Sequence, residues 1–191
     1  MTILHIDSAI TGEHSASREL TAAIVRELTA ADPRAQSTYR DLGAEPLPHL
    51  TLAAFGEADS LKALAEFQAA DTVVIGAPMY NFTIPSQLKA WIDRILVAGQ
   101  TFRYTETGAV EGLATGKRVI VAVARGGLYG EGTPERALEH AERYLADVFA
   151  FIGIKDVEFV VAEGLKISEA HRAAAIVGAH EKVRTLVSVN A

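Results

Sequence analysis

Cysteine is absent from this chain of 191 residues, and its absence excludes several kinds of chemistry. Without a thiol the protein forms no disulfide, no thiolate nucleophile and no cysteine-ligated zinc or iron–sulfur centre. The 6 histidines are scattered without metal-binding spacing, so we expect no metal site. Any redox activity would therefore depend on a bound organic cofactor.

Basic residues are also scarce relative to acidic ones. Lys and Arg number 18 against 24 Asp and Glu, which gives a net charge of −6. Because nucleic acids and anionic membranes are bound by basic surfaces, neither is an expected partner. No apolar run approaches the roughly 18 residues of a membrane span, and the first residues lack the pattern of a signal peptide. We therefore expect a cytoplasmic protein.

Apolar residues, by contrast, make up 49% of the chain, enough for a core covered on both faces. Short β-branched runs alternate with longer helical patterns, which is typical of a parallel sheet between helices. We expect one domain over residues 1–191. The expected strands are residues 2–8, 36–41, 72–77, 118–124 and 157–162, and the expected helices are residues 17–31, 58–69, 85–98, 134–151 and 169–189.

This pattern predicts an α/β fold of three layers, with a doubly wound, flavodoxin-like parallel sheet in the strand order 2-1-3-4-5. Residues 99–116 are expected to form a long excursion from the α/β pattern, rich in Gly, Thr and Glu. In such sheets ligands bind beyond the carboxyl ends of the strands. The loops after the first, third and fourth strands are therefore the expected site.

The first of these loops, residues 8–17, ends in the hydroxyls of Ser15 and Ser17 at the start of a helix. Free amides, the helix dipole and hydroxyls together suit a phosphate monoester. The serines can also act only as helix caps, and both interpretations can hold. The loop contains no G-x-G-x-x-G motif, and no Ser or Thr follows Gly116-Lys117, so neither a dinucleotide fingerprint nor a P-loop is predicted.

The second loop, Pro78-Met79-Tyr80-Asn81-Phe82, brings two aromatics, a methionine and an amide to the end of a buried strand. A flat, amphipathic ring such as isoalloxazine suits these residues, because it needs apolar contacts for its faces and amides for its edge. The alternative is that Tyr80 and Phe82 only fill the core.

The third loop, Ala124-Arg125-Gly126-Gly127, has paired glycines after a strand. Glycine lets the backbone approach a ligand closely, in this case the pyrimidine edge of the ring. Any tight turn between a strand and a helix can have the same sequence.

Taken in order along the chain, these motifs resemble the FMN-dependent NADH-azoreductases, also described as quinone reductases. Further matching segments include Thr101-Phe102-Arg103-Tyr104 and Ala162-Glu163-Gly164, so the resemblance covers almost the whole chain. It implies a flavodoxin-like homodimer with an FMN site near each subunit interface. It also implies hydride transfer from NADH or NADPH to quinones or azo compounds by a ping-pong scheme, without a catalytic side chain.

The resemblance assigns roles to individual residues. Phe102 and Phe151 correspond to apolar residues near the open face of the flavin. Ala9 and Ala124 stand where many members have serine. The residues expected to bind FMN are Ser8, Ala9, Ser15, Ala16, Ser17, Pro78, Met79, Tyr80, Asn81, Phe82, Ala124, Arg125, Gly126 and Gly127.

Two other functions fit the same sequence. An electron-transfer flavodoxin would bind FMN without its own small-molecule acceptor, although the long segment 99–116 favours an enzyme. An interaction domain without a cofactor is supported only by Ala9 and Ala124. The acidic residues Glu131, Glu135, Glu139 and Glu142 are expected to form a solvated helix surface.

Overall fold

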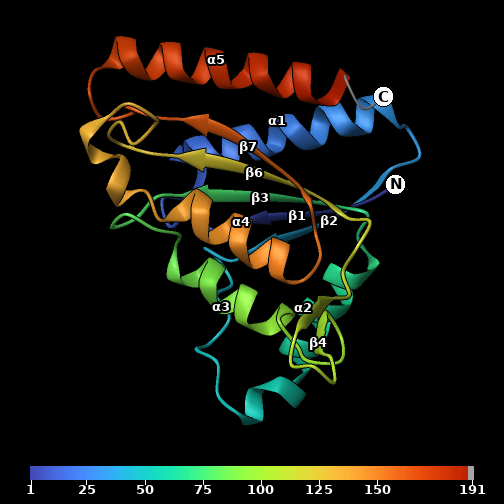
Figure 1. Ribbon diagram of the computed structural model, residues 1–191. Helices are drawn as coiled ribbons and strands as arrows, with labels where there is room; N and C mark the ends of the chain where they lie inside the picture. The colour runs from blue at the N-terminus through green and yellow to red at the C-terminus, as the bar shows by residue number, and fades with distance from the viewer. Residues whose placement is uncertain (189–191) are drawn as a thin grey trace.

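The central element of the protein is a sheet of five parallel strands, seen in a computed structural model that describes residues 1–188 (Figure 1). The strand order is β2-β1-β3-β6-β7, which confirms the predicted flavodoxin-like order. The strands are β1 (Thr2–Asp7), β2 (Gln36–Asp41), β3 (Thr72–Pro78), β6 (Arg118–Ala124) and β7 (Asp156–Ala162).

Helices cover both faces of the sheet, as Figure 1 shows. Helices α1 (Ala16–Ala31) and α5 (Glu169–Ser188) lie on one face, and α2 (Ala58–Ala69), α3 (Ser86–Ile95) and α4 (Ala141–Phe151) lie on the other. Short 3-10 turns are η1 (Gly12–His14), η2 (Ala53–Gly56) and η3 (Pro134–Leu138). Within residues 1–188, no helix has the length and apolar character needed to cross a membrane.

The central strand β3 divides the core into two halves. Val73 and Ile75 pack with Trp91 in the half under α2, α3 and α4, whereas Val74 packs with Ile24 under α1 and α5. Successive side chains of a strand point to opposite faces, so a strand buried on both faces must be apolar throughout. This is why β3 was recognisable in the sequence as an uninterrupted apolar run.

Two segments differ in detail from what the sequence predicted. The excursion over residues 99–116 contains a hairpin that was not predicted, in which β4 (Phe102–Tyr104) and β5 (Val110–Gly112) pair as antiparallel strands. The helix expected from residue 134 begins only at Ala141, because the Glu139 carboxylate accepts the backbone N–H groups of Ala141 and Glu142 and so caps α4 there. The expected last helix extended to residue 189, which lies outside the described residues.

The register of the strands brings four loops to one edge of the sheet. Asp7 pairs with Gly76, Pro78 with Ala124, and Ala124 with Ala162, close to the carboxyl end of each strand. The segments that follow β1, β3, β6 and β7 therefore emerge together, beside the point where the strand order reverses.

Candidate functional site

A cavity of about 640 Å³ lies at this edge of the sheet, and we call it the strand-end cavity. Its volume is within the roughly 300–1,000 Å³ typical of small-molecule sites. The lining comes from all four loops and from α5. The lining residues are Thr11, His14, Ser15, Ala16, Pro78, Met79, Tyr80, Asn81, Phe82, Ala124, Arg125, Gly126, Gly127, Tyr129, Leu165, Lys166 and Arg172.

One end of the strand-end cavity is the start of α1. Ser15 occupies the N-cap, where its Oγ accepts the backbone N–H of Arg18 at 3.5 Å and lies 2.9 Å from the Oγ of Ser17. The first-turn amides of a helix have no acceptor within the helix. Together with His14 and Arg172, which also line this cavity, they make the end of the cavity suitable for an anion.

The partly buried Arg18 stabilises the backbone next to this end of the cavity. The Arg18 guanidinium donates to both carboxylate oxygens of Asp41, at 2.7 and 2.5 Å, and to the Ala9 carbonyl oxygen at 3.3 Å. The hydrogen bonds from Arg18 lower the pKa of Asp41 below its ordinary value. Ser8 is fully buried and donates to the Gly76 carbonyl oxygen at 2.6 Å. Ser8, Ala9 and the buried Ser17 therefore lie beneath the lining, and their predicted contacts with FMN stay predictions.

The other end of the cavity is a tight turn after β3. Tyr80 and Thr83 exchange backbone hydrogen bonds at 3.0 and 3.2 Å, and the two residues between them have positive φ, 48° for Asn81 and 73° for Phe82. Positive φ at both central positions is the pattern of a type I′ turn, which asparagine tolerates but a bulky residue adopts at a cost. Strain of this kind persists only where the surroundings hold the backbone.

Contacts from distant parts of the chain hold this turn. The Ile10 backbone N–H donates to the Tyr80 hydroxyl at 3.2 Å, and the His140 backbone N–H donates to the Phe82 carbonyl oxygen at 3.1 Å. The Phe82 ring packs edge-on against Tyr129, with centroids 6.3 Å apart. Phe82 is still 44% exposed, so its ring is available to a ligand.

The wall between the two ends is the Ala124–Gly127 segment. A Cβ at Gly126 would lie 3.1 Å from Cδ of Lys166, whose side chain crosses the backbone at this point. The backbone N–H of Lys166 also donates to the Gly126 carbonyl oxygen at 3.0 Å. The absence of a side chain at Gly126 thus lets the segment after β7 close over the end of β6.

The Arg125 guanidinium is buried among three glutamates at the back of this wall, and we call these four residues the Arg125 cluster. It lies 2.7 Å from Glu142, 3.5 Å from Glu163 and 3.7 Å from Glu139. Glu139 is only 4% exposed, so the expectation of a solvated acidic surface is wrong for this residue. Burial raises the pKa of Glu142 even though Arg125 opposes the shift.

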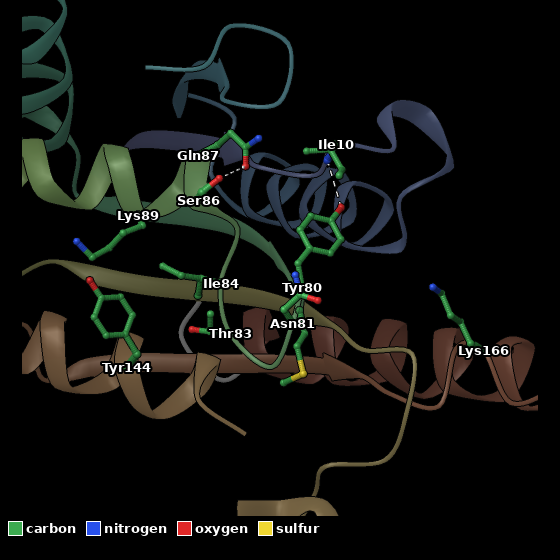
Figure 2. A pocket seen from close by; sticks show the side chains of 11 residues that line it. Ile10, Tyr80, Asn81, Thr83, Ile84, Ser86, Gln87, Lys89, Tyr144 and Lys166 are labelled. Atoms are coloured by element: carbon green, nitrogen blue, oxygen red, sulfur yellow. Dashed lines mark hydrogen bonds between the residues drawn. The ribbon is translucent and has the colours of Figure 1, made fainter. Parts of the chain in front are cut away.

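A second cavity of about 820 Å³ adjoins the first on the other side of the β3 turn, and we call it the side cavity (Figure 2). The two cavities share Met79, Tyr80, Asn81 and Lys166. In Figure 2 the Tyr80 ring points toward Ile10, whereas Lys89 and Tyr144 lie at the far end. Burial raises the pKa of Tyr144 to about 12, with a contribution from Asp93. The side cavity is larger but lacks the start of α1, so the strand-end cavity is the better candidate for an anionic ligand.

Phe102 and Phe151, expected near the open face of the flavin, line neither cavity. Their rings pack together with centroids 4.8 Å apart, and Phe102 also contacts Tyr104. The structure thus places the pair on the β4–β5 hairpin and the end of α4. Their predicted role stays a prediction.

Four lining residues lie outside the three loops predicted from the sequence: Tyr129, Leu165, Lys166 and Arg172. Thr11 and His14 lie in the first predicted loop but were not among the residues expected to bind FMN. Leu165 and Lys166 follow β7, whose carboxyl end meets the same edge of the sheet as the other strands. The general rule for ligand binding in parallel sheets would have found these two residues if it had been applied to the fifth strand. Tyr129 and Arg172 carry no such signal in the sequence.

Comparison with known proteins finds relatives that match almost the whole chain. A family model described as a flavodoxin-like fold matches residues 1–187. An FMN-dependent NADH:quinone oxidoreductase of Xanthomonas campestris pv. campestris is 53% identical over 97% of this chain and 99% of that protein. A protein of the same name from Rhizobium meliloti is 54% identical over 96% of this chain and 95% of its own length.

Solved structures give the same result. The azoreductase AzrA superposes with a TM-score of 0.88 at 29% identity, covering 98% of this chain and 99% of that one. An FMN-dependent NADH-azoreductase from Bacillus anthracis, solved in complex with FMN, also gives a TM-score of 0.88, at 25% identity, covering 100% of this chain and 99% of that one.

Proposed function

Because this chain belongs to the flavodoxin-like family of FMN-dependent NADH:quinone oxidoreductases, we propose that it binds FMN in the strand-end cavity and reduces quinones with NADH. The observation that carries the proposal is the composition of this single cavity. It joins an anion-binding helix start at Ser15 to an aromatic turn at Tyr80–Phe82.

The residues of the cavity fit FMN at both of its ends. The first-turn amides of α1 and the Ser15 hydroxyl would hold the phosphate, with Arg172 adding positive charge and His14 a hydrogen-bond donor. Met79 and Phe82 offer apolar surface for the ring, and the Asn81 amide offers a donor and an acceptor for its polar edge.

The overall reaction requires no nucleophile from the protein. One NADH gives two electrons and a proton, and the quinone takes these with a second proton from water to become a hydroquinone. FMN supplies the two-electron chemistry when bound, and the protein binds it, orients it and sets its electrostatic surroundings. Reductive cleavage of an azo compound to two amines consumes two NADH and two further protons. We propose it as a second activity, with donor and acceptor binding in turn.

We further propose that the protein is a homodimer of single-domain subunits. Phe102 and Phe151 lie away from both cavities of their own chain, and Tyr104 beside them is 65% exposed. A second copy packed against the hairpin would give these rings a role at the open face of the partner subunit's flavin. Light scattering on the purified protein tests this, and a monomer at micromolar concentration would contradict it.

An electron-transfer flavodoxin remains the second candidate, because it would use the same fold and the same FMN site. The side cavity favours the enzyme, since it adds surface beside the cofactor cavity that a small acceptor can use.

Anaerobic spectroscopy of the protein with FMN tests the proposal. We expect NADH to bleach the visible absorption of the bound flavin and a quinone to restore it, without any partner protein. Flavin that is bound but not reduced by NADH would support the electron-transfer flavodoxin. A protein that does not retain FMN would contradict the proposed site.

A further inference from the structure

Phe82 is held by one contact of its ring and one hydrogen bond of its backbone, and the groups that make both of these contacts are positioned by the Arg125 cluster. Phe82 needs such support, because its φ of 73° is unfavourable for a bulky residue and the residue is 44% exposed. Arg125 itself is only 3% exposed, and its guanidinium meets glutamates from the start of α4 and from the end of β7.

The first route runs through Glu163. Its Oε2 lies 3.5 Å from the Arg125 guanidinium and accepts the backbone N–H of Tyr129 at 3.0 Å. The loop lies so close that a Cβ at Gly130 would be 2.9 Å from Oε1 of Glu163. The Tyr129 ring placed in this way packs edge-on against Phe82.

The second route runs through the start of α4. Glu142 lies 2.7 Å from the guanidinium, and Glu139 caps the helix by accepting the backbone N–H groups of Ala141 and Glu142. These contacts fix the position of residue 140, whose backbone N–H donates to the Phe82 carbonyl oxygen. One route therefore holds the ring of Phe82 and the other holds its backbone.

We propose that Arg125 and Glu163 are positioning residues that hold Phe82 in its strained conformation in the turn after β3, where the flavin ring is proposed to bind. The inference rests on the proposed FMN site, since it states how that site is kept in shape before the cofactor arrives. When the turn is already ordered in the free protein, less of the binding free energy of FMN is lost in ordering it. The affinity for FMN should therefore depend on Glu163, which lines neither cavity, as well as on Arg125, which lines the strand-end cavity.

Titration of the apoprotein with FMN, followed by flavin fluorescence, tests this inference. We expect Arg125→Met to raise the Kd by about tenfold or more, and Arg125→Lys to recover part of the loss because it keeps the charge. Glu163→Gln should also raise the Kd although Glu163 lines neither cavity, and this loss separates positioning from direct contact with the cofactor. Glu131→Ala is the matched control, because Glu131 is an exposed glutamate of the same loop and lines neither cavity. Its Kd should equal that of the wild type.

A double-mutant cycle keeps the test valid if Arg125→Met does not fold. Glu163→Ala and Tyr129→Ala interrupt the same route. The Kd of the double variant for FMN should therefore equal the higher of the two single-variant Kd values, within about twofold. Additive effects would overturn the inference, as would an unchanged Kd in variants whose apoprotein melts at a lower temperature. A wild-type apoprotein that binds no FMN would instead overturn the proposed function itself.

Discussion

The two ends of the strand-end cavity are built in different ways. The anion end comes from one continuous segment, in which Ser15 and Ala16 begin a helix and the hydrogen-bonding groups follow from that start. The ring end is a strained turn held by Ile10, Tyr129 and His140, which lie tens of residues away in the sequence.

Because of this difference, the two ends should contribute to ligand affinity through different properties. The anion end uses groups that every helix start has, so its strength depends on local charge. The ring end depends on shape, because the conformation of Asn81 and Phe82 persists only while distant contacts hold it. A ligand with a phosphate probes both ends, whereas the same ligand without its phosphate probes the ring end alone. FMN and riboflavin are such a pair.

The largest expected effect is at the anion end. Ala16 is the first residue of α1 and lines the cavity, so Ala16→Asp places a carboxylate where the phosphate is proposed to bind. Juxtaposed like charges cost several kcal/mol, so we expect FMN affinity to fall about 100-fold. Riboflavin affinity should change by less than about threefold. Fluorescence titration with both ligands measures the two values.

The neutral variant Ala16→Asn is the control, because it adds nearly the same volume without the charge. Both variants should fold, since either side chain is tolerated at a helix start and a carboxylate interacts favourably with the helix dipole. Equal losses of FMN and riboflavin affinity in Ala16→Asp would show that the phosphate lies elsewhere.

A smaller effect of a different kind is expected at the ring end. Asn81→Ala removes the amide proposed to meet the ring and leaves polar atoms of the ligand unpaired, which costs about 1–3 kcal/mol. FMN and riboflavin should lose the same amount. Asn81→Gly controls for backbone strain, because glycine adopts the φ of 48° freely while also lacking the amide. A loss confined to FMN would contradict the assignment of this end.

The same contrast explains what the sequence could predict. The serines at the start of α1 and the aromatic loop after β3 were identified because each is a contiguous motif next to a predicted strand. The alternation of strands and helices fitted the flavodoxin-like strand order without fixing it, and right-handed crossovers limited the alternatives. Signals of this kind are local, and they located most of the cavity lining.

Local sequence patterns did not predict the contacts that shape the ring end, because these contacts join residues far apart in the sequence. Glu139 was expected on a solvated surface because acidic residues recur around it, yet it is buried beside Arg125 and caps α4. Nothing in the spacing of Arg125, Glu142 and Glu163 indicates that three separate elements meet at one guanidinium. The hairpin in residues 99–116 was missed for a similar reason, since its strands have three residues each.

Asp41, near the anion end, and Glu142, near the ring end, should contribute to stability with opposite dependence on pH. Hydrogen bonds from Arg18 hold the pKa of Asp41 below its ordinary value of 3.8. Its contribution to stability is therefore present above about pH 4 and is lost as the pH falls through the lowered pKa. We expect Asp41→Asn to lower the free energy of unfolding by about 1–3 kcal/mol near neutral pH. Urea unfolding should show the difference in stability between Asp41→Asn and the wild type narrowing as the pH falls below the ordinary value of 3.8. A difference that does not vary with pH would contradict the pairing.

The smallest effect is expected from Glu142, behind the ring end. Burial raises its pKa above the ordinary value of 4.5, since one guanidinium shared among three carboxylates does not fully offset desolvation. Its stabilising contribution is present below about pH 4.5 and is lost as the pH rises through the raised pKa. Glu142→Gln should therefore gain stability relative to the wild type as the pH rises toward neutrality, by about 1 kcal/mol or less. Urea unfolding across this range measures the difference, with the exposed Glu131→Gln as control. Glu142→Gln could instead lose stability relative to the wild type with rising pH, as expected for Asp41→Asn. That result would mean that Arg125 fully offsets the desolvation of Glu142, and the two ends would then have the same pH dependence.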